Sequence, residues 1–481
     1  MKKSYLFSAF AAGMVMLSAC SSDGDLTGGN ESNDAVQQIV LQVANAGDGL
    51  QTRAGRPLYS SEALQTIENV RVLVYKNDAA PAEGGAAPAK TIVLDKTLNW
   101  KESKDYATTD NGDHGRQLTI FLKGGDKLPQ GSYKIMAVGY SNKSDYTFSV
   151  GADYLTEETL AGKNKVYTDV KATLTPRKKA EEVFAGDAQI NINADQEVTN
   201  NTNGENGVVV TMHRQVAGGL GYFTNIPAKV DGAKAKYLRL VMRKSNDVLT
   251  FNNFNSSFIS DKDETSKKYV VNGGVSDKPF AADACFKGAT ANNGYVLYSI
   301  DLDKWFPNGD ANHDGVLGYD DYKKGKDAGL TDENNIYWKH PKDVNTTVVK
   351  GSVFAGNFII PFTKEDGNKT MELQLLDADN HILMIWNVTI PKADMNNDKT
   401  KGVVDESESI FNVVRNHMYN LGIKKTQGGN PDPGNPNPDP KPDPDPDKPD
   451  PDHKPEDLSK GQNLILKVND NWEAIHQLVI D

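Results

Sequence analysis

Residues 431–456, PDPGNPNPDPKPDPDPDKPDPDHKPE, place the strongest limit on how this chain can fold. Proline removes backbone donors and the acidic side chains repel one another, so we expect an extended polyproline II spacer that cannot pack. At ~3.1 Å per residue, such a spacer could reach about 80 Å. Residues 463–481 follow it, and there Leu464, Leu466 and Val468 alternate with more polar or outward-facing neighbours, the period of a half-buried β-strand.

A strand at the end of such a spacer has no sheet of its own. It either folds back onto its own subunit or completes the sheet of another subunit. The second alternative predicts a self-assembling structural protein, in which the apolar residues of this tail are a donor strand: Leu464, Leu466, Val468, Trp472 and Ile475.

The first twenty residues have the pattern of a bacterial export signal. Lys2 and Lys3 precede an apolar run that is too short for a stable membrane span. Leu17-Ser18-Ala19-Cys20 resembles a lipobox, so Cys20 is the expected lipidation site; an ordinary signal peptide that ends in Cys is the alternative. The acidic SSDGD that follows resembles the surface-export signal of Bacteroidia lipoproteins, which predicts a precursor held by lipid on the outer face of the outer membrane.

Residues 35–46 are expected to form a strand with Ile39, Leu41 and Val43 on one face. A glycine-rich, exposed loop is expected to follow at residues 47–57.

Two arginines in that loop are candidate sites for proteolysis. A trypsin-like protease cuts poorly after Arg56, because Pro57 is the next residue, whereas the bond between Arg53 and Ala54 has no such block. Arg53 and Ala54 are therefore the expected processing residues, and the alternative is that Arg53 is an ordinary surface arginine.

Charge and cysteine content exclude some classes of function. The 481 residues carry a formal net charge of −12 and no cluster of Lys or Arg, which argues against nucleic acid as a partner. Only two cysteines occur, Cys20 and Cys285, so no internal disulfide is expected once the leader with Cys20 is removed. The 42 glycines and frequent Asn, Asp, Thr and Val favour β-structure with many turns.

Short strand patterns separated by turn residues recur through the body of the chain and predict β-sandwiches. The expected strands are 70–75, 117–122, 133–140, 165–174, 208–212, 235–242, 295–302, 345–353, 355–362, 371–376, 381–390 and 418–423. Residues 377–381 are expected to be a hairpin turn.

We expect an all-β protein with two β-sandwich domains, a lipoprotein leader and a tethered C-terminal donor strand. The polar segment 194–207 suggests the boundary between the sandwiches. The predicted parts are a signal peptide (1–20), a leader with a removable strand (21–53), an N-terminal sandwich (54–205), a C-terminal sandwich (206–425), a Pro/Asp-rich linker (426–462) and the donor strand (463–481).

Two motifs give the chain a resemblance to a known family. RNHMYNLGI at 415–423 and HRQVAGGL at 213–220 look like segments of the fimbrilins of Bacteroidia. TRAG at 52–55, the Pro/Asp-rich spacer and the terminal strand with Trp472 resemble the branch of shaft subunits. The motifs are short, and the resemblance rests on their order along the whole chain.

The resemblance implies that the two sandwiches are Greek-key (transthyretin-like) domains, and it also implies a mechanism and a set of partners. A lipid-anchored precursor reaches the cell surface with the strand at 35–46 filling a groove in its first domain. An Arg-specific protease then cuts between Arg53 and Ala54, and the groove accepts residues 463–481 of another subunit. The implied product is a surface fimbrium that serves adhesion, a homopolymer that also contacts accessory and tip subunits.

Residues 310–321, DANHDGVLGYDD, match the pattern of an EF-hand calcium loop. The expected ligands of a structural Ca²⁺ are the side chains of Asp310, Asn312, Asp314 and Asp321 and the carbonyl of Val316. Aspartate stands at the twelfth position where glutamate is usual, which weakens or reshapes the site. The alternative is an Asp/Asn/Gly turn without an ion.

No catalytic motif is present in the sequence, and we expect this protein not to be an enzyme, although carboxylate pairs of glycosidases leave no sequence pattern. The alternative to a shaft subunit is a surface lipoprotein that binds a glycan or host protein as a monomer, or sits at the fibre tip. A tip subunit needs a groove but no donor, and a monomeric binder needs neither.

Overall fold

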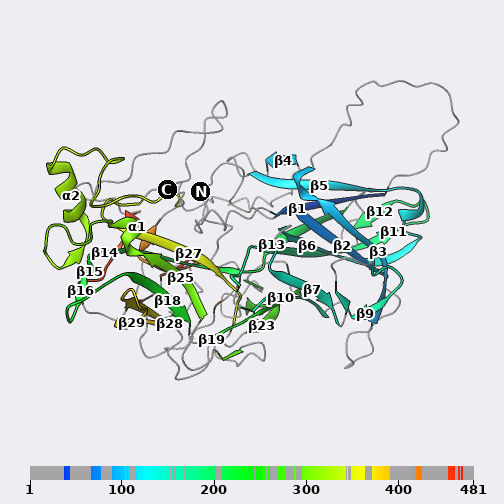
Figure 1. The fold of residues 1–481 in the computed structure, drawn as a ribbon. Helices are drawn as coiled ribbons and strands as arrows, with labels where there is room; N and C mark the ends of the chain where they lie inside the picture. Colours follow the sequence, from blue (N-terminus) through cyan, green and yellow to red (C-terminus); the bar gives the residue numbers. More distant parts are fainter. Residues whose placement is uncertain are drawn as a thin grey trace, which may run out of the picture. The chain divides into compact units, whose positions relative to one another are not determined.

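The secondary structure of this protein is almost entirely β (Figure 1). The structure is a computed structural model, and it describes residues 37–43, 67–76, 89–102, 104–107, 114–141, 144–151, 153–154, 159–166, 169–176, 178–200, 208–242, 244–252, 254, 258–259, 268–276, 287–288, 295–342, 344, 348–362, 371–389, 413, 415, 418–424, 453–460, 464–465 and 467–469. All of them belong to one unit, Val36–Asp481. The predicted all-β class is confirmed, whereas the Greek-key connectivity stays a prediction.

The largest sheet is built from the first half of the described chain. Its strands are, in spatial order, β4 (Lys104–Ala107), β5 (His114–Leu122), β1 (Gln37–Val43), β13 (Val208–Arg214), β11 (Phe184–Ile192), β6 (Gly131–Tyr140), β2 (Asn69–Lys76), β3 (Ala89–Asn99) and β9 (Asn164–Val166), with β12 (Val198–Asn200) beside β11. A smaller sheet runs β20 (Val248–Thr250), β10 (Val170–Leu174), β7 (Tyr146–Val150), β8 (Asp153–Tyr154).

Two further sheets come from the second half of the chain. One runs β27 (Val353–Ile359), β14 (Ala217–Thr224), β30 (Met418–Leu421), β35 (Lys467–Asn469), with β33 (Glu456–Asp457) also on β14. The other runs β25 (Tyr295–Asp301), β18 (Tyr237–Met242), β28 (Met371–Leu376), β29 (Ile382–Thr389), β34 (Leu464–Ile465).

Short pairings and helical turns complete the described elements. The pairings join β15 (Ile226–Pro227) to β26 (Val316–Leu317), β16 (Lys229–Val230) to β17 (Ala233–Lys234), β19 (Lys244–Ser245) to β24 (Lys287–Gly288), β31 (Ile423–Lys424) to β32 (His453–Lys454), and β21 (Phe258–Ile259), β22 (Lys268–Val271) and β23 (Gly274–Ser276) to one another. The helices are α1 (Leu302–Trp305) and α2 (Tyr319–Asp327), and the 3₁₀ turns are η1 (Trp100–Glu102) and η2 (Gly124–Asp126). Within the described ranges, no helix has the length and hydropathy of a membrane span.

The middle of the large sheet is apolar on both faces, because each face there packs on its own hydrophobic cluster. Strand β2 shows this directly: Val72 and Val74 belong to one cluster, while Leu73 and Tyr75 belong to the other. Side chains alternate between faces along a strand, so a strand with both faces covered reads as a continuous apolar run. This is why VRVLVY is buried throughout.

Most expected strands are present, and two are corrected. Residues 165–174 contain two strands in different sheets, because β9 pairs with β3 and β10 pairs with β7. The described residues 348–352 are not a strand as predicted: Gly351 has φ +77°, a left-handed conformation that makes a turn before β27. The predicted turn at 377–381 is confirmed by the bond from Asp377 N–H to the His381 carbonyl.

The first strand expected in the second sandwich pairs with strands of the large sheet. Residues 208–212 lie in β13, which pairs with β1 and β11 in the large sheet, so the chain enters the other sheets only after Arg214. The strand stays there because Val208 and Val210 are buried in the same cluster as β1. At Gly186 a side chain would collide with the backbone oxygen of Thr211, which explains a glycine in the middle of β11.

The two motifs that carry the family resemblance meet at this crossing. The buried guanidinium of Arg415 donates to the side-chain oxygen of Gln215 at 2.6 Å. Arg214 donates to Glu182 at 2.9 Å, and both side chains are buried. Next to them, β14 and β30 pair in parallel. The motifs therefore have a structural role in joining strands from distant parts of the chain.

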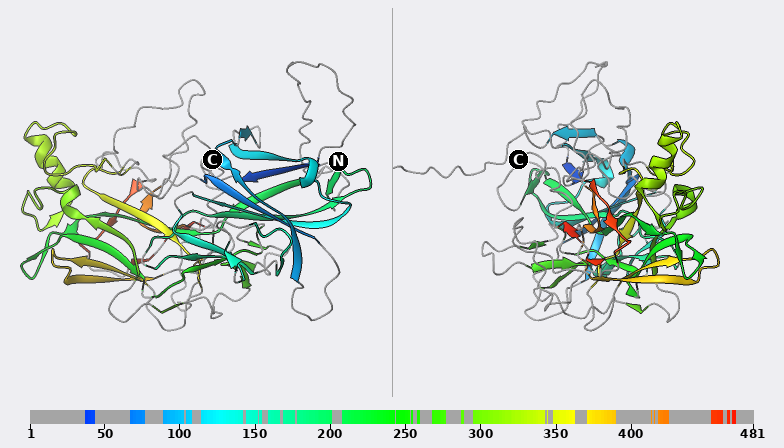
Figure 2. Two further views of the ribbon diagram at one scale, coloured as in Figure 1. Left: turned by 45° about the vertical axis from the view of Figure 1, so that its right-hand side comes forward. Right: turned by 90° about the vertical axis from the view of Figure 1, so that its left-hand side faces the viewer.

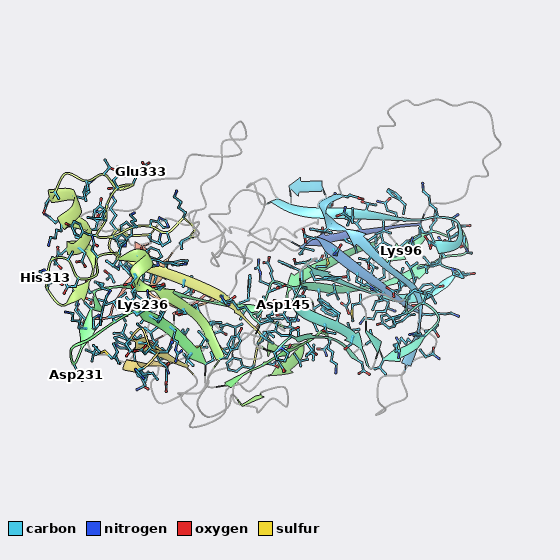
Figure 3. The ribbon with its side chains drawn as sticks, viewed as in Figure 1. Lys96, Asp145, Asp231, Lys236, His313 and Glu333 are labelled. Atoms are coloured by element: carbon cyan, nitrogen blue, oxygen red, sulfur yellow. The ribbon has the colours of Figure 1, made fainter. Side chains whose placement is uncertain are left out.

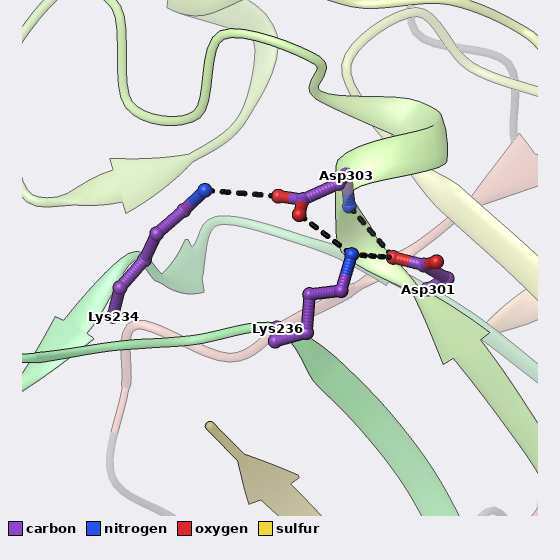
Figure 4. Close-up of polar contacts among 4 residues, drawn as sticks. All are labelled: Lys234, Lys236, Asp301 and Asp303. Atoms are coloured by element: carbon purple, nitrogen blue, oxygen red, sulfur yellow. Dashed lines mark hydrogen bonds and ion pairs between the residues drawn. The ribbon is translucent and has the colours of Figure 1, made fainter. Parts of the chain in front are cut away.

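A surface ion-pair network positions the short helix α1 (Figure 4). Lys236 lies 2.6 Å from Asp303 and 3.0 Å from Asp301, and Lys234 lies 3.0 Å from Asp303. The hydrogen bond from Lys236 to Asp303 raises the pKa of this lysine. Asp301 also caps the helix by accepting from the Asp303 N–H. The network is a structural feature of the outer surface and offers no reactive group.

Candidate functional site

Strand β1 fills a slot inside the large sheet rather than extending one of its edges (Figure 1). It pairs antiparallel with β5 over residues 37–42 and parallel with β13 over residues 39–43. Beyond β5 lies only β4, so within the described sheet the β4–β5 hairpin is joined to the remaining strands by β1. The strand that we predicted to be removable is therefore a central one.

The inward side chains of β1 fit the slot closely. Ile39 and Leu41 have no exposed surface, and both pack in the cluster that contains Ile120 and Val210 of the flanking strands. Burying such a side chain contributes about 1.5–3 kcal/mol. The predicted leader face, with Ile39 and Leu41 pointing inward, is what the structure contains.

A buried glutamine at the start of β1 was not anticipated from the sequence. The side-chain amide of Gln37 donates to the Leu128 carbonyl and accepts from the Leu128 N–H, both at 2.8 Å, and neither residue is exposed by more than 2%. Because both backbone groups of Leu128 are buried, removal of Gln37 leaves a donor and an acceptor without partners. A lone Gln in a strand pattern gives no sign of such a contact.

The tail folds back onto its own subunit, which is one of the two alternatives left open above. In β34, residues 464–465 pair in parallel with 388–389, and in β35 residues 467–469 pair with 418–420 (Figure 2). Leu464 is 1% exposed, in the core that it shares with Trp386 and Tyr419. These pairings are two and three residues long, much shorter than those of β1.

The prediction that residues 431–456 cannot pack is wrong for the last of them. His453 and Lys454 pair with Lys424 and Ile423, since an amide and a carbonyl remain available on these non-proline residues. The residues that flank the Pro/Asp-rich segment thus lie beside each other.

Leu458 then anchors the tail. It is buried, and its N–H donates to the Thr224 carbonyl at 3.1 Å. Since the tail is fixed to the subunit here, the length of the Pro/Asp-rich segment does not extend the reach of the terminal strand.

Several predicted site residues lie outside the described part of the structure. They are Cys20, Arg53, Ala54, Leu466, Trp472 and Ile475, and for Val468 the backbone is placed without its side chain. Their roles stay predictions.

The predicted calcium loop surrounds His313, which is labelled in Figure 3, and leads into α2. Asp310 accepts from the N–H groups of His313 (2.7 Å) and Gly315 (3.0 Å), and Gly315 has φ +93°, the sharp turn that the pattern requires. Asp321 is buried and accepts from three N–H groups of the loop, those of Ala311, Asn312 and Gly318. Burial raises the pKa of Asp321, although these hydrogen bonds oppose the shift.

One observation in this loop fits a cation. The Asn312 side-chain oxygen is buried and accepts no hydrogen bond, while its amide donates to Asp314 at 2.7 Å. The carboxylates are not gathered around a single point, so they would have to draw together to bind an ion.

A different acidic group lies at the turn between β28 and β29. In the described ranges, ligand atoms of three acidic or histidine side chains come within 4.8 Å of one another only at Asp377, Asp379 and His381. Asp377 accepts from the backbone N–H groups of Asp379 and His381 and lies 3.0 Å from the His381 ring. These bonds are those of a hairpin turn.

Comparison with known proteins gives similarity at the level of structure alone. No protein-family model matches the chain, and no curated protein matches its sequence. The similar solved structures include candidate adhesins and fimbrial proteins. A candidate adhesin from Bacteroides thetaiotaomicron is 13% identical, with a TM-score of 0.31 over 74% of this chain and 82% of that one.

Two of the similar structures are fimbrial proteins by description. A fimbrial assembly protein from Parabacteroides distasonis is 12% identical, with a TM-score of 0.25 over 73% of this chain and 98% of that one. The fimbrial anchor protein of Porphyromonas gingivalis is 10% identical, with a TM-score of 0.24 over 56% and 83%. At these scores the likeness carries no argument about the function of this chain.

Proposed function

We propose that this protein is a structural subunit of a surface fimbrium, which polymerises by donor-strand exchange and serves adhesion. In the proposed order, the chain is exported as a lipoprotein, an Arg-specific protease cuts between Arg53 and Ala54, and β1 leaves. The C-terminal strand of another subunit then fills the slot between β5 and β13.

The position of β1 is the observation that carries this proposal. A strand that precedes the predicted cleavage site occupies the interior of a sheet, so cutting the loop separates it covalently from all of its neighbours. Loss of β1 exposes the paired backbone of β5 and β13 and an apolar groove between them, an arrangement that favours addition of another strand.

Attachment of the leader to the membrane would make the strand exchange proceed in one direction. The leader carries Cys20, so in this proposal it stays at the outer membrane through its lipid while the processed subunit joins the fibre. A leader peptide that remains on the membrane cannot return readily to the slot. Accessory and tip subunits would contact the same slot or the same donor at the two ends of the fibre.

Proteolytic conversion of the purified precursor tests this function. After digestion with an Arg-specific protease, we expect a ladder of multimers on unboiled SDS gels and filaments in negative-stain microscopy, whereas uncut precursor stays monomeric. A precursor that is cut after Arg53 and still remains a monomer would favour the alternative, a monomeric surface lipoprotein that binds a glycan or host protein.

We further propose that residues 310–321 bind a structural Ca²⁺. Asp310, Asn312, Asp314 and Asp321 would supply side-chain oxygens, and Val316 its carbonyl. The unpaired oxygen of Asn312 supports this, because a buried acceptor without a donor is costly and a hard cation would satisfy it. The bound ion would also favour the ionised form of the buried Asp321.

Calcium binding is testable by calorimetry and thermal unfolding. Asp310→Ala combined with Asp314→Ala should abolish the binding heat, and Asp320→Ala, an exposed residue at a position without a ligand role, should leave it intact. At 100 times its Kd, Ca²⁺ should stabilise the wild type by about 2.7 kcal/mol and the double variant by none. If the wild type binds no Ca²⁺ at about 1 mM, the loop is only a turn.

A further inference from the structure

The slot of β1 requires a particular order of side chains. From the start of the strand, the inward positions are Gln37, Ile39 and Leu41, and all three are buried. Val40 faces outward, where it is opposite Thr119 and Val209, and Val209 is exposed. Any strand that replaces β1 has to repeat this order: an amide, then apolar residues at every second position.

The tail contains a second copy of this order. Residues 462–468 read QNLILKV, and β1 reads QQIVLQV. Placed side by side without a gap, the two segments match at the three inward positions: Gln462 with Gln37, Leu464 with Ile39 and Leu466 with Leu41; Val468 also corresponds to Val43 in the sequence. The outward positions keep Asn for Gln and Ile for Val, and the one charged residue, Lys467, corresponds to the outward Gln42.

We propose that residues 462–468 of a second copy of this chain enter the slot in this register, with Gln462 in the place of Gln37. The inference rests on the proposed donor-strand exchange and adds the residue-by-residue register and its determinant. In this register Leu464 is opposite Ile120 and Val208, the present partners of Ile39, and Ile465 is opposite Thr119 and Val209.

The buried backbone of Leu128 selects this register over its neighbours. A shift by one residue turns every side chain to the other face and brings Lys467 into the apolar cluster without a partner. A shift by two residues keeps the faces but places Leu464 or Lys460 beside Leu128, and neither side chain can accept a hydrogen bond from the N–H of Leu128. A primary amide both donates and accepts, so Gln462 satisfies both groups at once.

In the precursor, the donor strand packs on its own subunit, and this packing has to be released before exchange. Leu464 is buried in its own subunit while β1 is in place, and only short pairings hold β34 and β35. The slot offers pairing on both sides of the strand along its length. Exchange therefore replaces a short, two-site attachment by a continuous one.

Cross-linking between mixed subunits tests the register. The donor is the full chain with Cys285→Ser and Ile465→Cys, and the acceptor is the full chain with Cys285→Ser and Thr119→Cys. Gln117→Cys and Phe121→Cys are matched acceptors, because all three outward positions are two residues apart on β5 and share one type of antiparallel pair. After Arg-specific processing and mild oxidation, we expect the Thr119→Cys acceptor to give at least about fivefold more disulfide-linked dimer than either control.

The outcomes separate the register from the function. Ladders on unboiled gels with equal or greater cross-linking at Gln117→Cys or Phe121→Cys, or with none at all three, overturn the register while donor-strand assembly stands. If processed subunits form no ladder at all, both the register and the proposed donor-strand assembly are wrong.

A second measurement examines Gln462 itself. Gln462→Leu should slow assembly in the processed full chain and reduce the Thr119→Cys preference, whereas Asn463→Leu, at an outward position, should change neither. If Gln462→Leu and Asn463→Leu change the assembly rate and the cross-linking preference equally, Gln462 does not determine the register.

Discussion

Processed subunits that carry Leu466→Asp and Val468→Asp are expected to stop growing into fibres. Leu466 corresponds to Leu41, an inward residue of β1 with no exposed surface, and Val468 follows Leu466 by two residues, so that both belong to the same face of the donor strand. Two carboxylates would enter an apolar cluster in which no described residue of the slot offers them a cation, so docking of the donor would lose several kcal/mol. On unboiled gels the double variant should run as a monomer, and its yield of multimers should be at least about 100-fold lower than that of the wild type.

The matched control is Lys467→Asp. This variant also introduces an aspartate into the donor strand, but at an outward position. Fibres should therefore still form. Leu464 is retained in all of these variants, because its burial in the subunit's own core means that deletion of the tail would also destabilise the monomer, by about 2–5 kcal/mol. If the double variant forms ladders like the wild type, the terminal strand is not the donor, and the monomeric surface binder replaces the shaft subunit.

Retention of the leader is the second large effect that we expect. Arg53→Ala should leave the precursor uncut, keep β1 in its slot and prevent polymerisation almost completely. The physical reason is that an occupied slot has no free backbone or apolar groove to offer, since β5 and β13 are both paired with β1. Gel laddering and N-terminal sequencing of assembled subunits measure the two steps, and the sequence should begin at Ala54.

Arg56→Ala is the control for this site. It should have little effect, because Pro57 already protects the following bond. An N-terminus at Pro57, or one before Gly47, would show that a different bond is cut. An uncut Arg53→Ala precursor that still forms fibres would show that β1 does not have to leave.

Strand β1 could be predicted from the sequence in part, whereas its partners in the sheet could not. The alternation of Ile39, Leu41 and Val43 was sufficient to predict a strand, since a period of two needs only local sequence. Its neighbours could not be predicted, because β13 lies far along the chain and parallel pairing leaves no local pattern. Gln37 was missed for the same reason: its partner is the backbone of Leu128, and a backbone contact has no residue signature.

Strands β3, β7, β11 and β14 were not among the predicted strands, and β14 shows one reason. Strand β14, AGGLGYFT, is buried on nearly every residue, yet its glycines carry no hydrophobic period. Gly422, between β30 and β31, has φ +81° and a Cβ there would lie 2.6 Å from the Tyr222 carbonyl oxygen. Such positions are selected by close approach of another segment, which only the folded chain defines.

The amino-acid sequence by itself determined the all-β class, most strand positions, the hairpin turn at 377–381 and the apolar face of the leader strand. These depend on local alternation and turn residues, which act over a few positions. Tertiary structure decided that β1 is a central strand, that β13 belongs to the large sheet, and that the tail is anchored at Leu458 beside its own subunit. The reason is that pairing partners are chosen by burial of whole faces and by satisfaction of distant backbone groups, and neither is encoded within one stretch of the chain.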